Sequence, residues 1–215
     1  MSFQPPPAHA LVSQSLAAIQ RASEIHVVQK KELAELFGFE SRNKYSIEVD
    51  GQQLLFAAEQ GKGGLALLAR QFLGHFRSFE IHFFDTARSL VFRAVHPFRF
   101  FFQRLEVALA DGRPLGAIQQ RFAFFSKRFD VLDPSGQTLL RVSSPFYRPW
   151  TFAFQRNEAE VARVEKKWSG LLGEAFTDAD RFRVLYSAPD LRPDERALVL
   201  AAALFIDLQY FERKA

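Results

Sequence analysis

Short runs in which apolar and polar residues alternate recur along most of the chain from Ile25 onward. An alternation with a period of two, rich in Val, Ile, Phe and Tyr, is typical of strands that bury one face. Between the runs, Asp50-Gly51, Asp111-Gly112 and Asp133-Pro134-Ser135-Gly136 supply the backbone geometry of tight hairpin turns. Several short strands at this spacing predict a barrel or a sandwich. The predicted strands are Tyr45 to Val49, Gln53 to Ala57, Phe79 to Phe84, Ser89 to Val95, Arg104 to Ala108, Leu115 to Arg121, Arg128 to Leu132, Thr138 to Val142, Thr151 to Phe154, Glu160 to Val164 and Arg181 to Tyr186.

Two other segments have the apolar spacing of helices. Leu11 to Arg21 carries apolar residues on one face at 3.6 residues per turn. It follows Met1 to His9, which contains three consecutive prolines and is expected to be disordered. Ala197 to Ile206 reads ALVLAAALFI, and Pro193-Asp194-Glu195 precede it, so that carboxylates occupy the first helical turn, where the helix dipole favours them.

The apolar segment from Ala197 to Ile206 suits either a membrane span or a helix buried inside a protein. About ten residues at about 1.5 Å each reach roughly 15 Å, whereas the hydrocarbon core of a bilayer is roughly 30 Å thick. Extending the segment through Phe211 adds Asp207 and Gln209, which are costly in lipid. The pattern therefore favours a helix that is apolar on all sides because it is buried.

The composition limits the size and chemistry of the fold. The chain has 215 residues, of which 48% are hydrophobic and 24% charged, as in ordinary globular domains. We expect residues 1–24 to form an N-terminal lead, partly disordered or helical, and residues 25–215 to form one domain. The absence of cysteine excludes disulfides, thiolate metal sites and lipid anchoring through sulfur. The N-terminus lacks the pattern of a signal peptide, and the Ala, Arg and Phe usage is typical of a bacterial chain, so we expect a cytosolic protein.

Two regions at opposite ends of the chain resemble the phospholipid scramblase family. Trp168 to Asp180, reading WSGLLGEAFTDAD, and the terminal segment Ala197 to Phe211 match that family in order, and Glu32 to Glu59 is similar to the segment with which its domain begins. The resemblance covers roughly Ile25 to Ala215. It implies a mainly β, Tubby-like fold, with a closed barrel of about twelve strands around a buried hydrophobic C-terminal helix. It also implies ATP-independent, bidirectional movement of phospholipids between membrane leaflets.

The resemblance also implies a candidate calcium site. In scramblases the Asp-Ala-Asp that follows Phe-Thr opens a segment proposed to bind calcium, and here this places Asp178 and Asp180 as ligands, with Asp190 as a third. An EF-hand loop needs oxygen ligands at alternate positions and an acid at the twelfth. Counted from Asp178, Asp190 comes one residue late, and Arg181 and Arg183 add positive charge beside the acids. The pattern favours a turn leading into a strand, and any calcium binding is expected to be weak.

Cations and aromatic residues gather in the middle of the chain. Between Pro97 and Lys167 there are twelve Lys or Arg and only seven acids. Such mixtures suit a membrane interface, where cations attract anionic headgroups and rings sit at the polar boundary. The alternative is that most of the 25 Phe fill the barrel while Arg occupies outward positions. The residues predicted to contact membrane lipid are Arg99, Phe100, Phe101, Phe102, Arg104, Lys127, Arg128, Arg148 and Trp150.

Three functions remain open on these grounds. The first is a scramblase-like protein with a phospholipid membrane as its partner, preferring anionic lipids and lying on the inner face of the plasma membrane. The second is a soluble lipid- or phosphoinositide-headgroup-binding module of Tubby-like fold that does not move lipids. The third is a module that binds protein or nucleic acid, although no nucleic-acid-binding signature accompanies the basic charge and we expect no nucleic acid. The five histidines lack metal-ligand spacing and no phosphate-binding loop is present, so we expect no enzyme.

Overall fold

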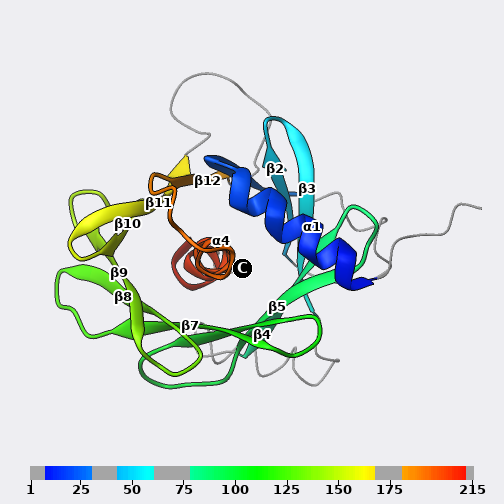
Figure 1. Cartoon of the computed structure of the whole chain (residues 1–215). Helices are drawn as coiled ribbons and strands as arrows, with labels where there is room; N and C mark the ends of the chain where they lie inside the picture. The colour runs from blue at the N-terminus through cyan, green and yellow to red at the C-terminus, as the bar shows by residue number, and fades with distance from the viewer. Residues whose placement is uncertain (1–7, 31–42, 61–77, 168–180, 212–215) are drawn as a thin grey trace, which may run out of the picture.

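Twelve antiparallel strands form one closed barrel around a central helix, as the sequence predicts (Figure 1). The computed structural model describes residues 8–30, 43–60, 78–167 and 181–211. Each strand pairs with its neighbours in the chain, and the first strand pairs with the last to close the barrel. The strands are β1 (Glu24–Gln29), β2 (Lys44–Val49), β3 (Gln52–Glu59), β4 (Phe79–Asp85), β5 (Leu90–His96), β6 (Arg104–Leu109), β7 (Pro114–Arg121), β8 (Ser126–Leu132), β9 (Thr138–Pro145), β10 (Thr151–Arg156), β11 (Ala159–Lys167) and β12 (Arg181–Tyr186).

Strand β1 is the one strand that the sequence pattern does not predict. It reads EIHVVQ, and Ile25, Val27 and Val28 are all buried, so that its alternation is broken at its end. β1 pairs with β2 on one side and with β12 on the other. It therefore supplies the ladder that joins the two ends of the sheet, and the barrel has no open edge there.

Inward and outward side chains alternate along the barrel strands. In β4, Phe79, Ile81 and Phe83 are buried, whereas Glu80 and His82 between them are half-buried. Period-two alternation sends successive side chains to opposite faces of the sheet, so one face of each strand lines the interior. Within the described residues eight phenylalanines are buried and eight are exposed, so the alternative that most Phe fill the barrel is not confirmed.

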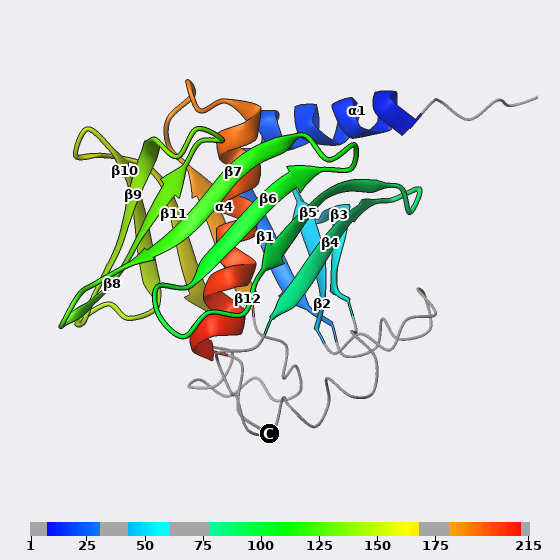
Figure 2. The same ribbon diagram turned by 90° about the horizontal axis from the view of Figure 1, so that it is seen from below.

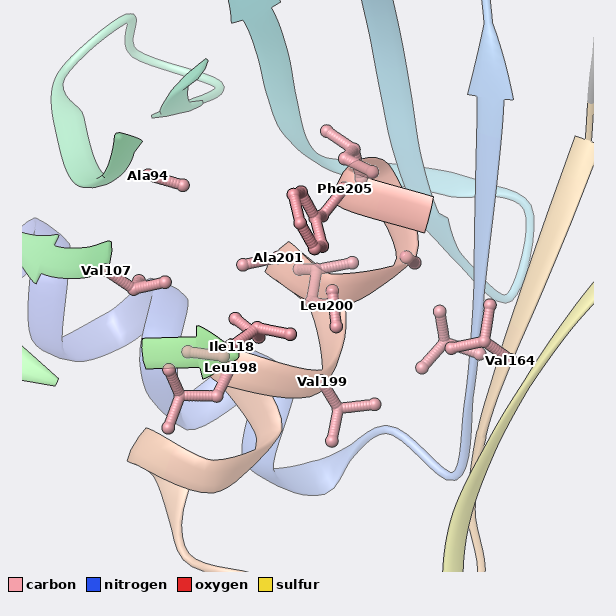
Figure 3. Packing of buried hydrophobic residues seen from close by; sticks show 14 of the residues in the cluster. Ala94, Val107, Ile118, Val164, Leu198, Val199, Leu200, Ala201 and Phe205 are labelled. Carbon is pink, nitrogen blue, oxygen red and sulfur yellow. The ribbon is translucent and has the colours of Figure 1, made fainter. Parts of the chain in front are cut away.

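Helix α4 (Pro193–Ile206) runs through the middle of the barrel and is buried from Glu195 to Ile206. Leu198, Leu200 and Phe205 leave the helix in different directions and pack among side chains from the surrounding strands (Figure 3). The prediction of a buried C-terminal helix is therefore confirmed. None of the helices in the described residues is both long enough and apolar enough to cross a bilayer.

Helix α1 (Ala8–Arg21) lies across the end of the barrel at which α4 begins (Figure 2). It includes the stretch with helical spacing. The buried guanidinium of Arg196 in α4 donates hydrogen bonds to the backbone oxygens of Ile19 and Ala22, and it lies 4.5 Å from the ring centroid of Tyr186. Burial raises the pKa of Tyr186 and lowers the pKa of Arg196. This end of the barrel is thus closed by α1 and a buried polar cluster.

Candidate membrane-contact site

Three described loops lie at the other end of the barrel, where α4 ends. In an antiparallel barrel with neighbours in chain order, the connections after β5, β7 and β9 all lie at one end. Residues 97–103, 122–125 and 146–150 form these connections. The π-helical turn η2 (Asp207–Phe211), which continues α4, reaches the same end, because Trp150 packs against Phe211 with ring centroids 5.0 Å apart.

These three loops carry a set of exposed aromatic side chains that we call the aromatic rim. Phe124 and Phe125 are 83% and 82% exposed, and Phe101 is 80% exposed. Within the described residues, every large hydrophobic side chain that is exposed belongs to this set. Exposed apolar side chains gathered at one end of a molecule mark sites that contact a partner or a membrane. The aromatic rim consists of Phe98, Phe100, Phe101, Phe102, Phe122, Phe124, Phe125, Phe146, Tyr147 and Trp150.

The opposite end of the barrel has a different surface. There the strands are joined by tight turns that carry Asp50, Asp111, Asp133 and Glu158. Hydrogen bonds from Ser135 and from the backbone of Gln137 lower the pKa of Asp133, which keeps this turn anionic. The three loops of the aromatic rim, by contrast, contain no Asp or Glu. Among the described connections, the rings therefore lie at one end of the barrel, whereas the tight turns at the other end carry carboxylates together with Arg88 and Arg113.

Cations surround the aromatic rim. Arg99 and Arg148 lie within its loops and are exposed, and Arg121 and Arg128 flank the loop between β7 and β8. Cations beside exposed rings suit the boundary of an anionic bilayer, because they attract the headgroups while the rings occupy the interface. The cations and the exposed rings of these loops therefore both suit contact with an anionic membrane.

The loop from residue 97 to residue 103 is held by hydrogen bonds to β7. Phe102 has a φ of 50°, a left-handed conformation that is uncommon for a bulky residue. The side chain of Gln119 donates to the carbonyl oxygen of Phe102 at 2.9 Å, and the buried Gln103 receives a backbone hydrogen bond from Gln120 at 2.8 Å. These contacts fix a loop that presents its rings outward in place of burying them.

A polar cluster lies inside the mouth of the barrel, beneath the rim. The ammonium of Lys127 lies 4.3 Å from the ring centroid of Tyr210 and 4.8 Å from that of Phe211. Burial lowers the pKa of Lys127 and raises the pKa of Tyr210 to about 12. Cation–π contacts of this kind are stronger where water is excluded. Lys127 therefore helps to hold the end of the helix in place.

The predicted lipid-contact residues fall in three positions. Phe100, Phe101, Phe102 and Trp150 belong to the aromatic rim, and Arg99, Arg128 and Arg148 lie exposed beside it. Arg104 lies on β6, where its Nε is 3.1 Å from Glu106. Lys127 is half-buried in the mouth of the barrel.

Sequence reasoning did not predict the loop between β7 and β8 as part of the site. Phe122, Phe124 and Phe125 are among the most exposed residues of the rim, and Phe98, Phe146 and Tyr147 join them. The signal that could have found this loop is the run RFAFFSKR, in which rings and cations mix without an acid. It breaks the alternation of the strands on either side of it.

Of the three acids predicted as calcium ligands, only Asp190 lies in the described part of the chain. Asp190 follows β12 at the end of the barrel opposite the rim, and its Oδ2 lies 2.8 Å from Nη1 of Arg156. Asp178 and Asp180 lie outside the described residues, as does the segment from Gly61 to Gly74. Within the described ranges, no three His, Asp or Glu side chains form a group that could hold a metal ion.

Comparisons with known proteins match almost the whole chain. The profile of the family described as Scramblase matches residues 2–213. Phospholipid scramblase 2 of Homo sapiens is 30% identical over an alignment that covers 99% of this chain and 75% of that protein. Phospholipid scramblase 1 of Mus musculus is 29% identical, with 99% of this chain and 68% of that protein covered. A phospholipid scramblase family protein of Schizosaccharomyces pombe is 26% identical over 96% of this chain and 62% of that protein. No solved structure matches the chain.

Proposed function

The chain belongs to the scramblase family, and from this premise we propose that it docks on phospholipid membranes through its aromatic rim and moves phospholipids between leaflets in both directions without ATP. One observation carries the docking step. All the exposed large hydrophobic side chains of the described residues lie at one end of the barrel, among cations and without acids in their loops. We place the protein peripherally on the inner face of the plasma membrane, where anionic lipids would attract this end.

The rim has the chemistry of a membrane anchor. Aromatic rings favour the interface between headgroups and hydrocarbon, since their apolar faces leave water while their edges stay near polar groups. Each cation near an anionic surface adds about 1 kcal/mol of attraction, and salt weakens that attraction within a Debye length. Binding by the rim should therefore depend on anionic lipid and on ionic strength, and also on the rings themselves.

The filled barrel limits how lipids could move. The residues of α4 from Ala197 to Phe205 are at most 1% exposed and occupy the barrel interior. A headgroup that crosses the hydrocarbon region needs polar partners along its way. Since α4 occupies the interior, a headgroup would have to move along the outer wall of the barrel. The same observation favours a second candidate function, a module that binds lipid or a phosphoinositide headgroup and moves nothing.

Flotation with vesicles tests the docking step. The purified chain is mixed with vesicles of phosphatidylcholine alone or with phosphatidylglycerol added, and the bound fraction is measured at low and high salt. We expect binding to the anionic vesicles that weakens with salt. Phe124→Ser/Phe125→Ser should reduce vesicle affinity by roughly tenfold, because both rings are exposed and can contribute to the interface without supporting the fold.

Two variants serve as controls for this experiment. Phe124→Trp/Phe125→Trp keeps interfacial rings at the same positions and should retain binding. Gln52→Ser/Gln137→Ser changes two exposed residues at the opposite end of the barrel, at the start of β3 and in the turn after β8, and should also bind as the unmodified chain does. Equal binding by the serine variant of the rim would contradict docking through the rim.

Calcium enters the proposal as an ion held weakly by Asp178 and Asp180, without Asp190, which follows the other end of β12 and pairs with Arg156. Repeating the flotation with calcium and with a chelator tests it, using Asp178→Asn/Asp180→Asn as the variant. A calcium-dependent gain that this variant abolishes would support the site. Identical binding with calcium and with chelator would remove calcium from the proposed function.

A reconstituted assay tests lipid movement itself. Vesicles containing the protein carry a fluorescent phospholipid in either leaflet, and a membrane-impermeant quencher reports how fast the label becomes accessible. Movement from both leaflets without ATP would support scrambling. Flotation without movement would leave the lipid-binding module, and movement that requires ATP would contradict the proposed activity.

A further inference from the structure

An open groove on the outer wall of the barrel adjoins the aromatic rim. Its volume is about 970 Å³, and it is lined by side chains from β7, β8, β9 and β10, which lie side by side on the wall (Figure 2), and from the loop after β5. Four of the lining residues are arginines: Arg99, Arg121, Arg128 and Arg141. One carboxylate, Asp130, is present among them. The groove therefore carries a net positive charge of three.

Outward arginines on the other side of the barrel face carboxylates. On β11, Arg163 lies 2.8 Å from Glu160, and on β12, Arg183 lies 2.7 Å from Glu165. Hydrogen bonds from these guanidinium groups outweigh the effect of burial and lower the pKa of Glu165. Carboxylates on β11 thus neutralise the outward arginines of β11 and β12.

In the groove, by contrast, one carboxylate lies among four arginines. Asp130 Oδ2 lies 3.2 Å from Nε of Arg121. In the described part of the chain, Arg99, Arg128 and Arg141 form no ion pair, although Arg141 stands directly opposite Asp130 in the β8–β9 register. Three of the four guanidinium groups are therefore available to an anion from outside.

Register places two of these arginines opposite one another. Arg121 on β7 pairs directly with Arg128 on β8, so that their side chains leave the same face of the sheet. Like charges directly opposite one another across a strand pair destabilise the sheet. An anion bound between them would remove this repulsion, and guanidinium groups bind phosphate oxygens through two parallel hydrogen bonds.

The groove is continuous with the aromatic rim. A second hollow of about 530 Å³, lined by rings of the rim, shares Phe102, Phe122, Arg121 and Arg128 with the first. Rings and cations thus line both hollows, and the second hollow adds Phe100 and Phe101 of the rim. A molecule that occupies both hollows needs an anionic part for the groove and an apolar part for the rim, and a phospholipid has both in one molecule.

We propose that the arginine groove binds the phosphate of an anionic phospholipid headgroup, while the acyl chains of that lipid remain in the membrane at the aromatic rim. This inference rests on the proposed membrane function and names the lipid class that the site takes. The groove would give a headgroup polar partners on the outer wall of the barrel, since α4 fills the interior.

Water-soluble short-chain lipids separate this inference from membrane docking. Dihexanoyl phosphatidic acid, kept below the concentration at which it forms micelles, is titrated into the full chain and followed by calorimetry. We expect saturable binding that dihexanoyl phosphatidylcholine does not reproduce. Arg128→Gln/Arg141→Gln should weaken it by roughly tenfold or more, because hydrogen bonds to charged groups are strong.

The control removes the same charge elsewhere. Arg113→Gln/Arg181→Gln changes two exposed arginines outside the groove and should leave the affinity for the short-chain lipid unchanged. Phe124→Ser/Phe125→Ser should weaken vesicle binding and keep short-chain binding, since neither ring lines the groove. This pattern separates failure of the groove from failure of the rim.

Four results would overturn the proposal. Absence of binding to the short-chain lipid would do so, as would an equal loss of affinity in the control variant. Inorganic phosphate binding as tightly as the lipid would assign the groove to a free anion. Displacement of the lipid by a short oligonucleotide at a lower concentration than by inorganic phosphate would assign it to nucleic acid.

Discussion

Lys166 and Asp207 form an ion pair inside the mouth of the barrel, with Nζ 3.5 Å from Oδ1 and with side chains only 6% and 3% exposed. The hydroxyl of Tyr45 donates to the other carboxylate oxygen of Asp207 at 2.8 Å. The ammonium of Lys166 also lies 4.5 Å from the ring centroid of Phe211. The pair joins β11 to the first residue of η2, and so it ties the end of the central helix to the barrel wall.

Breaking this pair should destabilise the protein strongly. Lys166→Met removes the ammonium that lies 3.5 Å from the buried carboxylate of Asp207, and breaking a buried ion pair costs about 3–5 kcal/mol of unfolding free energy. Urea unfolding followed by circular dichroism measures the change. Lys166→Met/Asp207→Asn removes both charges and should recover part of the loss. The exposed pair of Arg163 and Glu160 is the control, since Arg163→Gln should cost about 1 kcal/mol or less. A loss that small for Lys166→Met would contradict the structural role of the buried pair.

The central helix should not accept a charge. Ala202 is 1% exposed, so Ala202→Asp would bury a carboxylate without a partner and should abolish folding. Leu200→Asp should do the same, and Leu200→Ala should cost about 2–5 kcal/mol through loss of packing. Ala17→Asp, on the exposed face of α1, is the matched control and should fold normally. A soluble and cooperatively unfolding Ala202→Asp chain would show that α4 is not packed inside the barrel.

Gly116 is required by both backbone conformation and space. Its φ is 145°, and a Cβ at this position would overlap the carbonyl oxygen of Leu132 in β8 and lie 3.1 Å from a methyl group of Leu198 in α4. Gly116→Ala should therefore lower the unfolding free energy by about 3 kcal/mol or more, as expected when a strained conformation and an overlap coincide. Gly112→Ala separates the two causes, because Gly112 has a φ of 88° and open space around it. Thermal unfolding of both variants should show a much larger loss at Gly116, and equal losses would exclude the overlap.

Tyr210 should make stability fall at alkaline pH. Burial raises its pKa to about 12, although the hydrogen bond from Gln120 opposes this, whereas an unfolded tyrosine titrates near 10. Above pH 10 the folded chain holds a proton that the unfolded chain has lost. The contribution of Tyr210 to stability is complete below pH 10 and is lost as the pH rises toward 12. The loss of unfolding free energy amounts to about 1 kcal/mol by pH 11. Tyr210→Phe should lose less stability between pH 8 and pH 11 than the unmodified chain, as measured by urea midpoints. Identical losses in the two chains would contradict the raised pKa.

Local patterns were enough to predict eleven of the twelve strands and the buried helix, whereas the choice of a closed barrel over a sandwich came from the family resemblance. The alternation in segments such as Phe79 to Phe84 reflects burial of one strand face, and the run from Ala197 to Ile206 lacks a polar face that could meet water. Both signals come from neighbouring residues along the chain. β1 was missed because Val28 interrupts its alternation and because its place is decided by partners at both ends of the sheet.

The candidate site was predicted only in part, since sequence shows which residues are aromatic or basic but not which of them share a face. Phe83 fills the barrel and Phe124 is 83% exposed, although both stand in Phe-rich runs. What separates them is whether the residue lies in a strand or in a loop, and which loops meet at one end depends on the direction of every strand. In the same way Arg121 faces Arg128 only because of the β7–β8 register.

The sequence by itself therefore determined every strand except β1, the tight turns and the apolar helix, because each depends on the spacing of neighbouring side chains. Only the tertiary structure decided that three distant loops form one aromatic rim and that four arginines line one groove. The physical reason is closure of the barrel. Closure fixes the direction and neighbours of every strand, so that loops far apart in the sequence lie at the same end of the barrel.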